Sequence, residues 1–351
     1  MTVNFSKPVL IFLFILAMLL SGCRKDDISG INIIAGGASF PYPLYQEMFK
    51  QYNMDNEIWV NYQAVGSGTG IKKLLDRTID FGGTDAFLSD QQLIEADGDI
   101  VHIPTCLGGV TLSYNLSLKA QLKLTPELIS NIFMGKITNW NNKEIQAENP
   151  GIVLPDQDIT VVHRSDSSGT TFIFSDYLSK VNAEWSVKIG RGKILEWPVG
   201  TGARKNSGVA AQLKQLPGAI GYIEVAYARE NNIPYAQVKN ESGNFISPDL
   251  TSISLAGAGV IPDDTRTTIT NTRAEYGYPI SGFTWLILYK EQNYQSRSKK
   301  RSKAILDVLW WMIHDGQDFN EILGYGKLPE NVVRKSEKIL KDITFDGKKI
   351  L

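Results

Sequence analysis

Residues 163–174 (HRSDSSGTTFIF) gather side chains that together suit the binding of an anion. Arg164 offers a planar fork of N–H donors that matches a tetrahedral oxyanion, and Ser168 and Thr170 add hydroxyl donors. The segment then turns apolar, as at the start of a helix, whose first turn presents unpaired N–H groups and the positive end of its dipole. The chemistry that these residues suggest is anion recognition.

Two further loops carry the same combination of residues. Residues 35–45 (AGGASFPYPLY) and residues 65–75 (VGSGTGIKKLL) each follow an expected strand and precede an expected helix, as residues 164–174 do. Glycine lets the backbone approach a ligand, and serine or threonine supplies hydroxyl donors at a helix N-terminus. One such loop would be ordinary helix capping, but three in one chain predict an oxyanion site.

The strand expected over residues 158–166 sets the direction of Arg164. Alternation along a strand places Arg164 on one face and His163 on the other. We therefore expect His163 to be a packed or rim side chain and not a base beside Ser167 or Ser168. Asp166 has two compatible interpretations: it pairs with Arg164 at the surface, or it holds the guanidinium plane and leaves the other edge for a ligand.

Motifs that would indicate other chemistry fail on spacing. Gly66, Gly68 and Gly70 do not form GxGxxG because Ile71 stands at the third position, and the sequence has no GxxxxGK[ST] loop and no GxSxG elbow. The three histidines lack HExxH spacing and cysteine partners, so we expect no metal site and no cofactor. A net charge of -1 disfavours nucleic acid as a partner. Cys106 is expected to be a small buried hydrophobe.

The order of the expected elements predicts an α/β protein. Strands and helices alternate, which favours a parallel or mixed sheet with helices on both faces. We expect strands at residues 31–37, 57–65, 79–89 (with its loop), 99–106, 158–166, 219–228 and 281–290. We expect a glycine turn at residues 66–70 and helices at residues 41–53, 71–77, 124–136, 303–316 and 329–340.

The length of the chain allows two domains, since 351 residues exceed an ordinary single domain. No long linker separates two halves, which suggests that the chain crosses between two lobes more than once. A cleft between such lobes is a natural ligand site. Residues 204–208 (RKNSG) either line the rim of this cleft or form a simple charged turn.

The N-terminus predicts export. In residues 1–22, Lys7 precedes an apolar run that is too short for a comfortable membrane span but suits a secretion signal. Residues 20–23 (LSGC) are similar to the bacterial lipobox, which makes Cys23 the expected lipid-modified N-terminus and residues 23–31 a tether. An ordinary signal peptide with an incidental cysteine is the alternative. We expect a protein of the periplasm or cell surface, anchored by lipid to a bacterial membrane.

Several spaced motifs resemble the phosphate-binding protein of bacterial phosphate ABC transporters, the PstS family. They are AGGASFPYPLY, NYQAVGSGTGIKKLLDRTIDFGGTDAFLSD, VVHRSDSSGTTFIFSDYLSKVN, LPGAIGYIEVAYA, PISGFTWLILYK and LPENVV, and the similarity runs from about Ile31 to the C-terminus. The resemblance implies the two-lobe periplasmic-binding-protein type II fold, with mixed sheets flanked by helices and a ligand cleft between the lobes. We expect lobe I to comprise residues 32–106 and 278–351, and lobe II residues 107–277.

The resemblance also implies which residues bind phosphate. Carried onto this sequence, the ligand set is Ser39, the backbone N–H of Phe40, Ser67 and Asp85 from lobe I, and Arg164, Ser168, Gly169 and Thr170 from lobe II. Asp166 would support Arg164. Ser39 stands where the family commonly has threonine, which keeps the hydroxyl. Ser167 stands where glycine is common, which leaves its loop less free.

Asp85 bears on the choice of anion. A carboxylate repels an anionic ligand unless the ligand brings a proton, and phosphate near neutral pH carries at least one whereas sulfate does not. An ionised carboxylate is acceptor-only, so Asp85 is expected to accept the phosphate O–H and to leave sulfate an unmatched repulsion. The alternative is that Asp85 caps a helix away from the ligand.

The function that the resemblance implies is capture of inorganic phosphate and its delivery to the transmembrane permease subunits of an ABC importer, which a cytoplasmic ATPase drives. We expect a monomer without catalytic residues. A receptor for another oxyanion and a phosphate sensor without a transporter are alternatives. A phosphatase with Ser168 as nucleophile is a third, disfavoured because the sequence offers no positioned base and no metal cluster.

Overall fold

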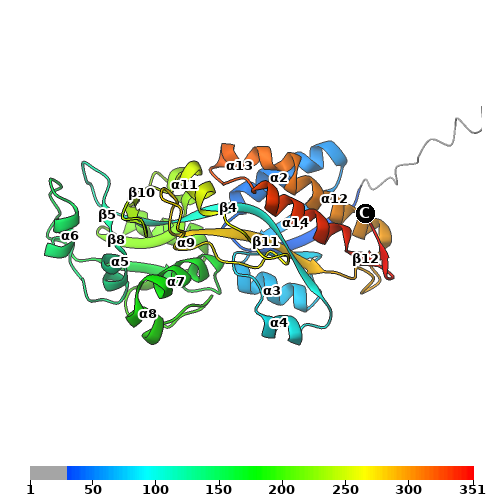
Figure 1. The fold of residues 1–351 in the computed structure, drawn as a ribbon, viewed down its shortest axis with the longest axis horizontal. Coiled ribbons are helices and arrows are strands. Elements are labelled where there is room, and N and C mark those ends of the chain that lie inside the picture. Colours follow the sequence, from blue (N-terminus) through cyan, green and yellow to red (C-terminus); the bar gives the residue numbers. More distant parts are fainter. Residues whose placement is uncertain (1–29) are drawn as a thin grey trace, which may run out of the picture.

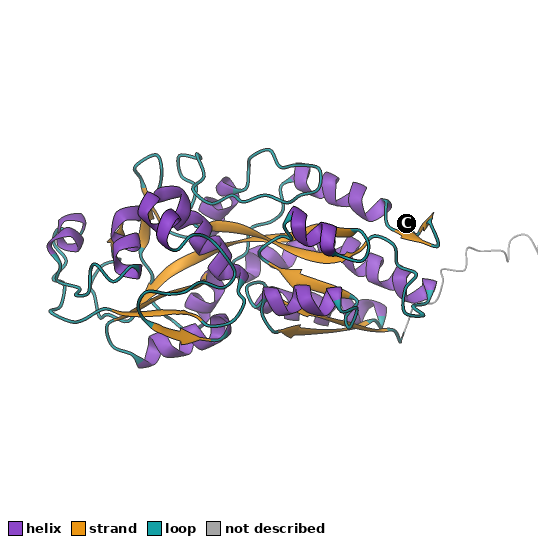
Figure 2. Cartoon of the chain, turned by 90° about the horizontal axis from the view of Figure 1, so that it is seen from below, coloured by secondary structure: helices purple, strands orange, loops and turns teal. Residues whose placement is uncertain are grey.

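A computed structural model describes residues 30–351, and Figure 1 shows their fold. The predictions for the signal peptide, for Cys23 and for the tether up to residue 29 lie outside the described residues. The described chain forms two lobes, and Figures 1 and 2 both show long strands that run from one lobe into the other. Within residues 30–351, no helix is both long and apolar enough to cross a membrane.

One mixed sheet of eight strands runs through both lobes. In sheet order the strands are β2 (Trp59–Ala64), β1 (Asn32–Gly37), β3 (Phe81–Thr84), β11 (Ser281–Tyr289), β4 (Ile100–Tyr114), β8 (Ala219–Glu224), β6 (Thr160–Arg164) and β7 (Thr201–Ala203). The smaller sheets comprise β10 (Phe245–Ile246), β9 (Gln237–Lys239) and β5 (Lys123–Leu124), and β12 (Thr344–Phe345) with β13 (Lys348–Lys349).

The two ends of the large sheet are parallel and its centre is antiparallel. β1 pairs in parallel with β2 and β3, and β6 pairs in parallel with β8 and β7. Between them, β11 and β4 run antiparallel to their neighbours. Loops that follow parallel strands open at the same edge of a sheet. Each lobe therefore brings its strand-to-helix loops to one edge.

Strand β4 belongs to both lobes. It pairs with β11 as far as Gly109 and with β8 from Val110 onward. The strand predicted over residues 99–106 therefore continues to Tyr114, because almost all of its side chains are buried between covering layers. The lobe boundary predicted between residues 106 and 107 remains a prediction, and the change of pairing partner lies three residues beyond it.

Helices lie on both sides of the sheet (Figure 1). They are α2 (Tyr42–Asn56), α3 (Ser67–Leu75), α4 (Asp90–Glu95), α5 (Pro126–Phe133), α6 (Lys143–Glu148), α7 (Gly169–Val181), α8 (Ala183–Lys188), α9 (Lys205–Gln215), α10 (Val225–Glu230), α11 (Leu250–Ala256), α12 (Lys299–Ile313), α13 (Asp318–Leu323) and α14 (Glu330–Lys341), with the short 3-10 helix η1 (Asp315–Gln317). Local signals set several starts: Thr125 caps α5, and Pro126 follows it at the first position.

The predicted glycine turn at residues 66–70 is wrong, because helix α3 begins inside it. Gly66 adopts φ 96 and turns the chain from β2 directly into the helix, which starts at Ser67. Gly70 serves close packing: a Cβ there would lie 2.5 Å from Cα of Gly37. The glycines of α3 allow the helix to lie close against the backbone of neighbouring strands, and Ser67 thereby reaches the lobe junction.

The strand predicted over residues 219–228 is correct only up to Glu224. There the carboxylate of Glu224 accepts the N–H of Ala226 at 2.7 Å and caps helix α10. Residues 219–228 are all buried and mostly apolar, a pattern that fits either a strand or a helix. The cap decides that the strand ends and a helix begins.

Candidate anion-binding site

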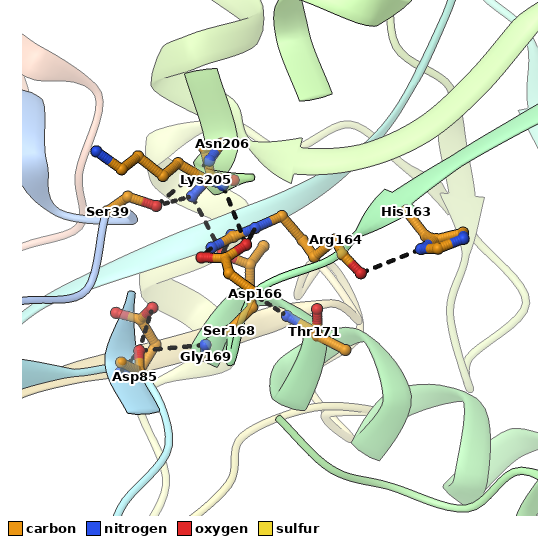
Figure 3. A network of polar contacts seen from close by, with 12 residues as sticks. Ser39, Asp85, His163, Arg164, Asp166, Ser168, Gly169, Thr171, Lys205 and Asn206 are labelled. Atoms are coloured by element: carbon orange, nitrogen blue, oxygen red, sulfur yellow. Dashed lines mark hydrogen bonds and ion pairs between the residues drawn. The ribbon is translucent and has the colours of Figure 1, made fainter. Parts of the chain in front are cut away.

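The three strand-to-helix loops meet where the two lobes touch (Figure 3). The hydroxyl oxygen of Ser67, at the start of α3, accepts the N–H of Gly169, at the start of α7, over 3.1 Å. The N–H of Gly68 donates to the carbonyl of Ser167 over 3.1 Å. All eight predicted ligand residues are buried: Ser39, Phe40, Ser67, Asp85, Arg164, Ser168, Gly169 and Thr170.

Arg164 ends strand β6, and its side chain is only 1% exposed, so it is not a surface residue. Nε and Nη2 donate to the two carboxylate oxygens of Asp166 over 2.7 and 2.6 Å, while Nη1 reaches Oγ1 of Thr170 at 3.3 Å. The hydroxyl of Tyr222 accepts the backbone N–H of Arg164. Asp166 thus holds one edge of the guanidinium and leaves the Nη1 edge turned toward the loop of α7.

Asp166 is held in its ionised form. Burial raises its pKa, but the hydrogen bonds and charge of Arg164 outweigh burial and hold the pKa of Asp166 below its usual range. The backbone N–H of Lys205 donates to the same carboxylate over 3.1 Å. The pair therefore contributes one fixed cation and one fixed anion to the site.

Asp85 lies just after strand β3 and points to the same junction (Figure 3). Its Oδ1 accepts the hydroxyl of Thr284 over 2.7 Å, and its Oδ2 accepts that of Ser67 over 3.3 Å. Burial raises the pKa of Asp85 to about 7, although Thr284, the charge of Arg164 and Ser67 lower it. The helix-cap alternative is wrong, because Ser89 caps the following helix α4.

Ser168 caps helix α7, since its hydroxyl oxygen accepts the N–H of Thr171 over 3.0 Å. Its own O–H is thereby free to point elsewhere. His163 turns away, as predicted: its Nδ1 lies 3.1 Å from the carbonyl of Arg164, and its ring stacks on Trp197 at 4.9 Å between centroids. The described residues therefore show no hydrogen bond from His163 to Ser168.

Two tyrosines hold the loop that precedes α2. The hydroxyl of Tyr227 donates to the carbonyl of Ser39 over 2.6 Å, and that of Tyr325 donates to the carbonyl of Phe40 over 2.8 Å. These two hydrogen bonds fix the loop, and the Ser39 hydroxyl that it carries contacts Asn206 across the lobe junction. Neither tyrosine has a local sequence signal that marks it as part of the site.

Sequence reasoning also missed the role of Asn206. Of the two interpretations of residues 204–208, the simple charged turn is wrong, because helix α9 begins at Lys205, and the rim of the cleft stays a prediction. Asn206 is fully buried and hydrogen bonds to Ser39. Cys106 is fully buried, as predicted. Among residues 30–351, no group of three or more His, Cys, Asp and Glu residues is arranged to hold a metal ion.

A two-lobed α/β fold with crossing strands, and with a buried arginine among helix N-termini at the lobe junction, defines a solute-binding protein of the periplasmic type. Residues 26–315 match the family model of the PBP superfamily domain. The chain is 38% identical over 317 residues to the phosphate-binding protein PstS of Xylella fastidiosa, which covers 89% of this chain and 85% of that protein. The chain belongs to the PstS family of phosphate-binding proteins.

A further relative by sequence agrees with this membership, and two solved structures show a similar fold. The phosphate-binding protein PstS of Methanocaldococcus jannaschii is 33% identical over 334 residues, which cover 89% of this chain and 86% of that protein. A high-affinity periplasmic phosphate-binding protein (PfluDING), solved with bound phosphate, has a TM-score of 0.69 at 22% identity and covers 88% of this chain and 93% of its own. The phosphate-binding protein of Stenotrophomonas maltophilia has a TM-score of 0.68 at 18% identity, with coverages of 87% and 92%. These two structures share the fold.

Proposed function

We propose that this protein captures inorganic phosphate outside the cytoplasm and delivers it to the permease of an ABC-type phosphate importer. The observation that carries the proposal is the buried guanidinium of Arg164, held by Asp166 at the junction where the lobes meet and close enough for its charge to lower the pKa of Asp85. Membership of the PstS family supports the same ligand.

The proposed ligand contacts come from both lobes. They are the hydroxyls of Ser39, Ser67, Ser168 and Thr170, the backbone N–H groups of Phe40 and Gly169, the guanidinium of Arg164 and the carboxyl of Asp85. The N–H of Gly169, which donates to Ser67 in this structure, would turn to the ligand. Phosphate would enter between the lobes, which close on it by a hinge movement. Neutral dipoles and one arginine then balance the anion, and no step of catalysis is required of these residues.

Asp85 gives the site its preference among tetrahedral anions. The other proposed contacts are donors, and donors serve phosphate and sulfate alike. A carboxylate can accept a hydrogen bond from the proton that phosphate carries and sulfate lacks, so it stabilises bound phosphate and repels sulfate. The site is thus suited to an oxyanion that still bears a hydrogen.

Phosphate titration of purified residues 24–351, followed by tryptophan fluorescence, tests the proposal. Trp285 packs edge to face on Phe87, two residues beyond Asp85, so closure around a ligand should change its emission. We expect saturable binding of phosphate in the presence of a large excess of sulfate, and no release of phosphate from a chromogenic phosphate monoester. Sulfate binding equal to that of phosphate would refute the ligand, and turnover of the monoester would indicate an enzyme.

We also propose that a lipid on Cys23 anchors the mature protein, as a monomer, to a bacterial membrane, with residues 23–31 as its tether. The sequence LSGC and the preceding apolar run support this proposal. Cys23→Ser should abolish incorporation of labelled fatty acid. Phosphate affinity should stay unchanged, because all the proposed ligand residues lie between Ser39 and Thr170. Labelling that persists in this variant would contradict the anchor.

A further inference from the structure

Asn206 links the two lobes at the centre of the candidate site. It lies in the first turn of α9 and is fully buried. Its Nδ2 lies 3.2 Å from Oγ of Ser39, in the loop before α2, and 3.1 Å from Oγ1 of Thr170, in α7 (Figure 3). One amide group therefore holds a hydroxyl from each lobe.

The orientation of this amide follows from its third contact. The backbone N–H of Glu224 donates to Oδ1 of Asn206 over 3.1 Å. A backbone N–H can only donate, so the atom that faces Glu224 must be the amide oxygen. The NH₂ group then faces the two hydroxyls and must donate to both of them.

Both hydroxyl oxygens thereby have their acceptor positions filled. Oγ of Ser39 also receives the backbone N–H of Asn206 at 3.3 Å, and Oγ1 of Thr170 also receives Nη1 of Arg164 at 3.3 Å. A hydroxyl accepts two hydrogen bonds and donates one. Each hydroxyl has only its own hydrogen left, so each can meet a ligand oxygen only as a donor.

Ser67 differs from these two hydroxyls. Its oxygen accepts the N–H of Asp85 at 3.2 Å and that of Gly169 at 3.1 Å, and its own O–H donates to Oδ2 of Asp85 over 3.3 Å. Two hydroxyls of the site, those of Ser39 and Thr170, are thus limited to donating to a ligand. A ligand O–H that faced either of them would meet another hydrogen, so a proton on the ligand finds its acceptor in the carboxylate of Asp85.

We propose that Asn206 is a positioning residue, which makes Ser39 and Thr170 obligate donors to bare ligand oxygens and ties the two lobes together in the closed form. The proposal rests on the proposed phosphate function and deepens it. Its consequence is that the site favours a tetrahedral anion with a single proton over one with two. Loss of the amide should therefore weaken phosphate binding, speed its dissociation and reduce the preference for the singly protonated anion over the doubly protonated one.

Two substitutions separate positioning from mere support of the fold. Asn206→Ala removes the donor, frees both hydroxyls to rotate and should weaken phosphate binding by on the order of tenfold to a hundredfold, with most of the loss in a faster dissociation rate. Asn206→Asp places an acceptor where the donor was. Its carboxylate would take the hydroxyl hydrogens of Ser39 and Thr170 away from the ligand, so binding should be weaker still at about pH 8.

The pH dependence of Asn206→Asp is the decisive measurement. Once protonated, the introduced carboxyl can again donate, so the ratio of its phosphate Kd to that of the wild type should narrow by roughly tenfold between about pH 8 and about pH 5.5. Dividing by the wild-type Kd cancels the ionisation of phosphate itself. For Asn206→Ala, the ratio of its phosphate Kd to that of the wild type should change only by a small factor over this range. The ratio should be slightly lower at about pH 5.5, because a hydroxyl freed by the substitution can accept a hydrogen bond from the doubly protonated phosphate present there.

The charged groups around the amide are Arg164, Asp166, Lys205 and Glu224 in its own lobe and Asp85 across the junction. All of them are present in both variants, so a pH effect that comes from these neighbours alone should appear in both. Equal pH slopes for the two variants would trace the effect to these neighbours and overturn the proposal.

Asn149→Asp is the matched control, since Asn149 is a buried amide of the same lobe whose Nδ2 donates to the carbonyls of Lys123 and Ile145. It should lower the Tm without changing the pH slope of relative affinity. Unchanged phosphate affinity and dissociation rate in Asn206→Ala would also overturn the proposal, even if Asn206→Asp failed to fold. A wild type that does not bind phosphate would instead refute the proposed function.

Discussion

Thr284 donates its hydroxyl to Oδ1 of Asp85 over 2.7 Å, although 199 positions separate the two residues in the sequence. The contact forms because β11 pairs antiparallel with β3, and Trp285 lies opposite Thr84. Burial raises the pKa of Asp85 to about 7, and the Thr284 hydroxyl is the largest of the effects that oppose burial. The carboxyl therefore titrates near neutral pH, where its protonation decides which anions it tolerates.

Sulfate should compete with phosphate more effectively at about pH 5.5 than at about pH 8. Below the pKa of about 7, Asp85 is protonated and can donate to a bare sulfate oxygen, whereas above it the carboxylate repels sulfate. Calorimetric titration with sulfate across this range measures the sulfate Kd directly, and sulfate does not change its own ionisation there. A sulfate Kd that does not change with pH would remove Asp85 from the selectivity mechanism.

Two variants of Asp85 serve as controls for this prediction. Asp85→Ala deprives a buried phosphate O–H of its acceptor, which should cost roughly 1–3 kcal/mol of phosphate binding. Sulfate binding should weaken less or become stronger, so the preference for phosphate over sulfate should fall. Asp85→Asn should retain more phosphate affinity than the alanine variant and admit sulfate better than the wild type, and neither variant should keep the pH dependence of sulfate competition.

Without phosphate, Asp85→Asn should raise the Tm above that of the wild type, and the difference should grow as the pH rises from about 4 to about 7. The pKa of Asp85 in the folded protein, about 7, exceeds its ordinary value of 3.8, so the folded state binds the proton more tightly than the unfolded state. The wild type therefore loses stability across this window, whereas the amide does not titrate. Scanning calorimetry at several pH values measures the difference, and a constant difference would contradict the raised pKa.

The anion-binding loops were predictable because their signals are local. Serine, threonine and glycine between a strand and a helix mark a helix N-terminus wherever the helix lies, and Ser67 and Gly169 are found at such starts. Thr284 and Asn206 carry no such signal. Their roles depend on which strands pair and on how the lobes close, and these depend on contacts between distant parts of the chain.

The fold class was predictable for the same reason, since alternating strands and helices are local patterns. The ends of the helices and strands were less predictable. The strand at residues 219–228 gives way to a helix at Glu224, and β4 continues to Tyr114. In both places the residues are buried on both faces, so the alternation of polar and apolar side chains that would mark the ends of a strand is missing.

Arg164→Lys should lower phosphate affinity by on the order of tenfold or more, because an ammonium keeps the charge but loses the fork that meets Asp166 and the ligand together. Arg164→Ala should cost more, since hydrogen bonds to charged groups are worth roughly 1.5–3 kcal/mol each and Asp166 would be left without its partner. Phosphate titration of both variants at neutral pH measures the loss. Unchanged affinity in the alanine variant would place the anion site elsewhere.

Gly169→Ala should weaken phosphate binding by preventing close contact of the two lobes. A Cβ at Gly169 would lie 2.5 Å from the Ser67 hydroxyl and 2.6 Å from both Cβ and Oδ2 of Asp85, so α7 would have to move away from the loops of lobe I. The matched control is Gly208→Ala, in the first turns of α9, where a Cβ meets its nearest neighbour, Ala203, at an ordinary 3.7 Å. That variant should bind phosphate normally and gain roughly 0.5–1 kcal/mol of stability, as alanine does in place of glycine within a helix. Titration and thermal unfolding of both variants decide the matter, and equal affinities would show that the lobes need not approach this closely to hold the ligand.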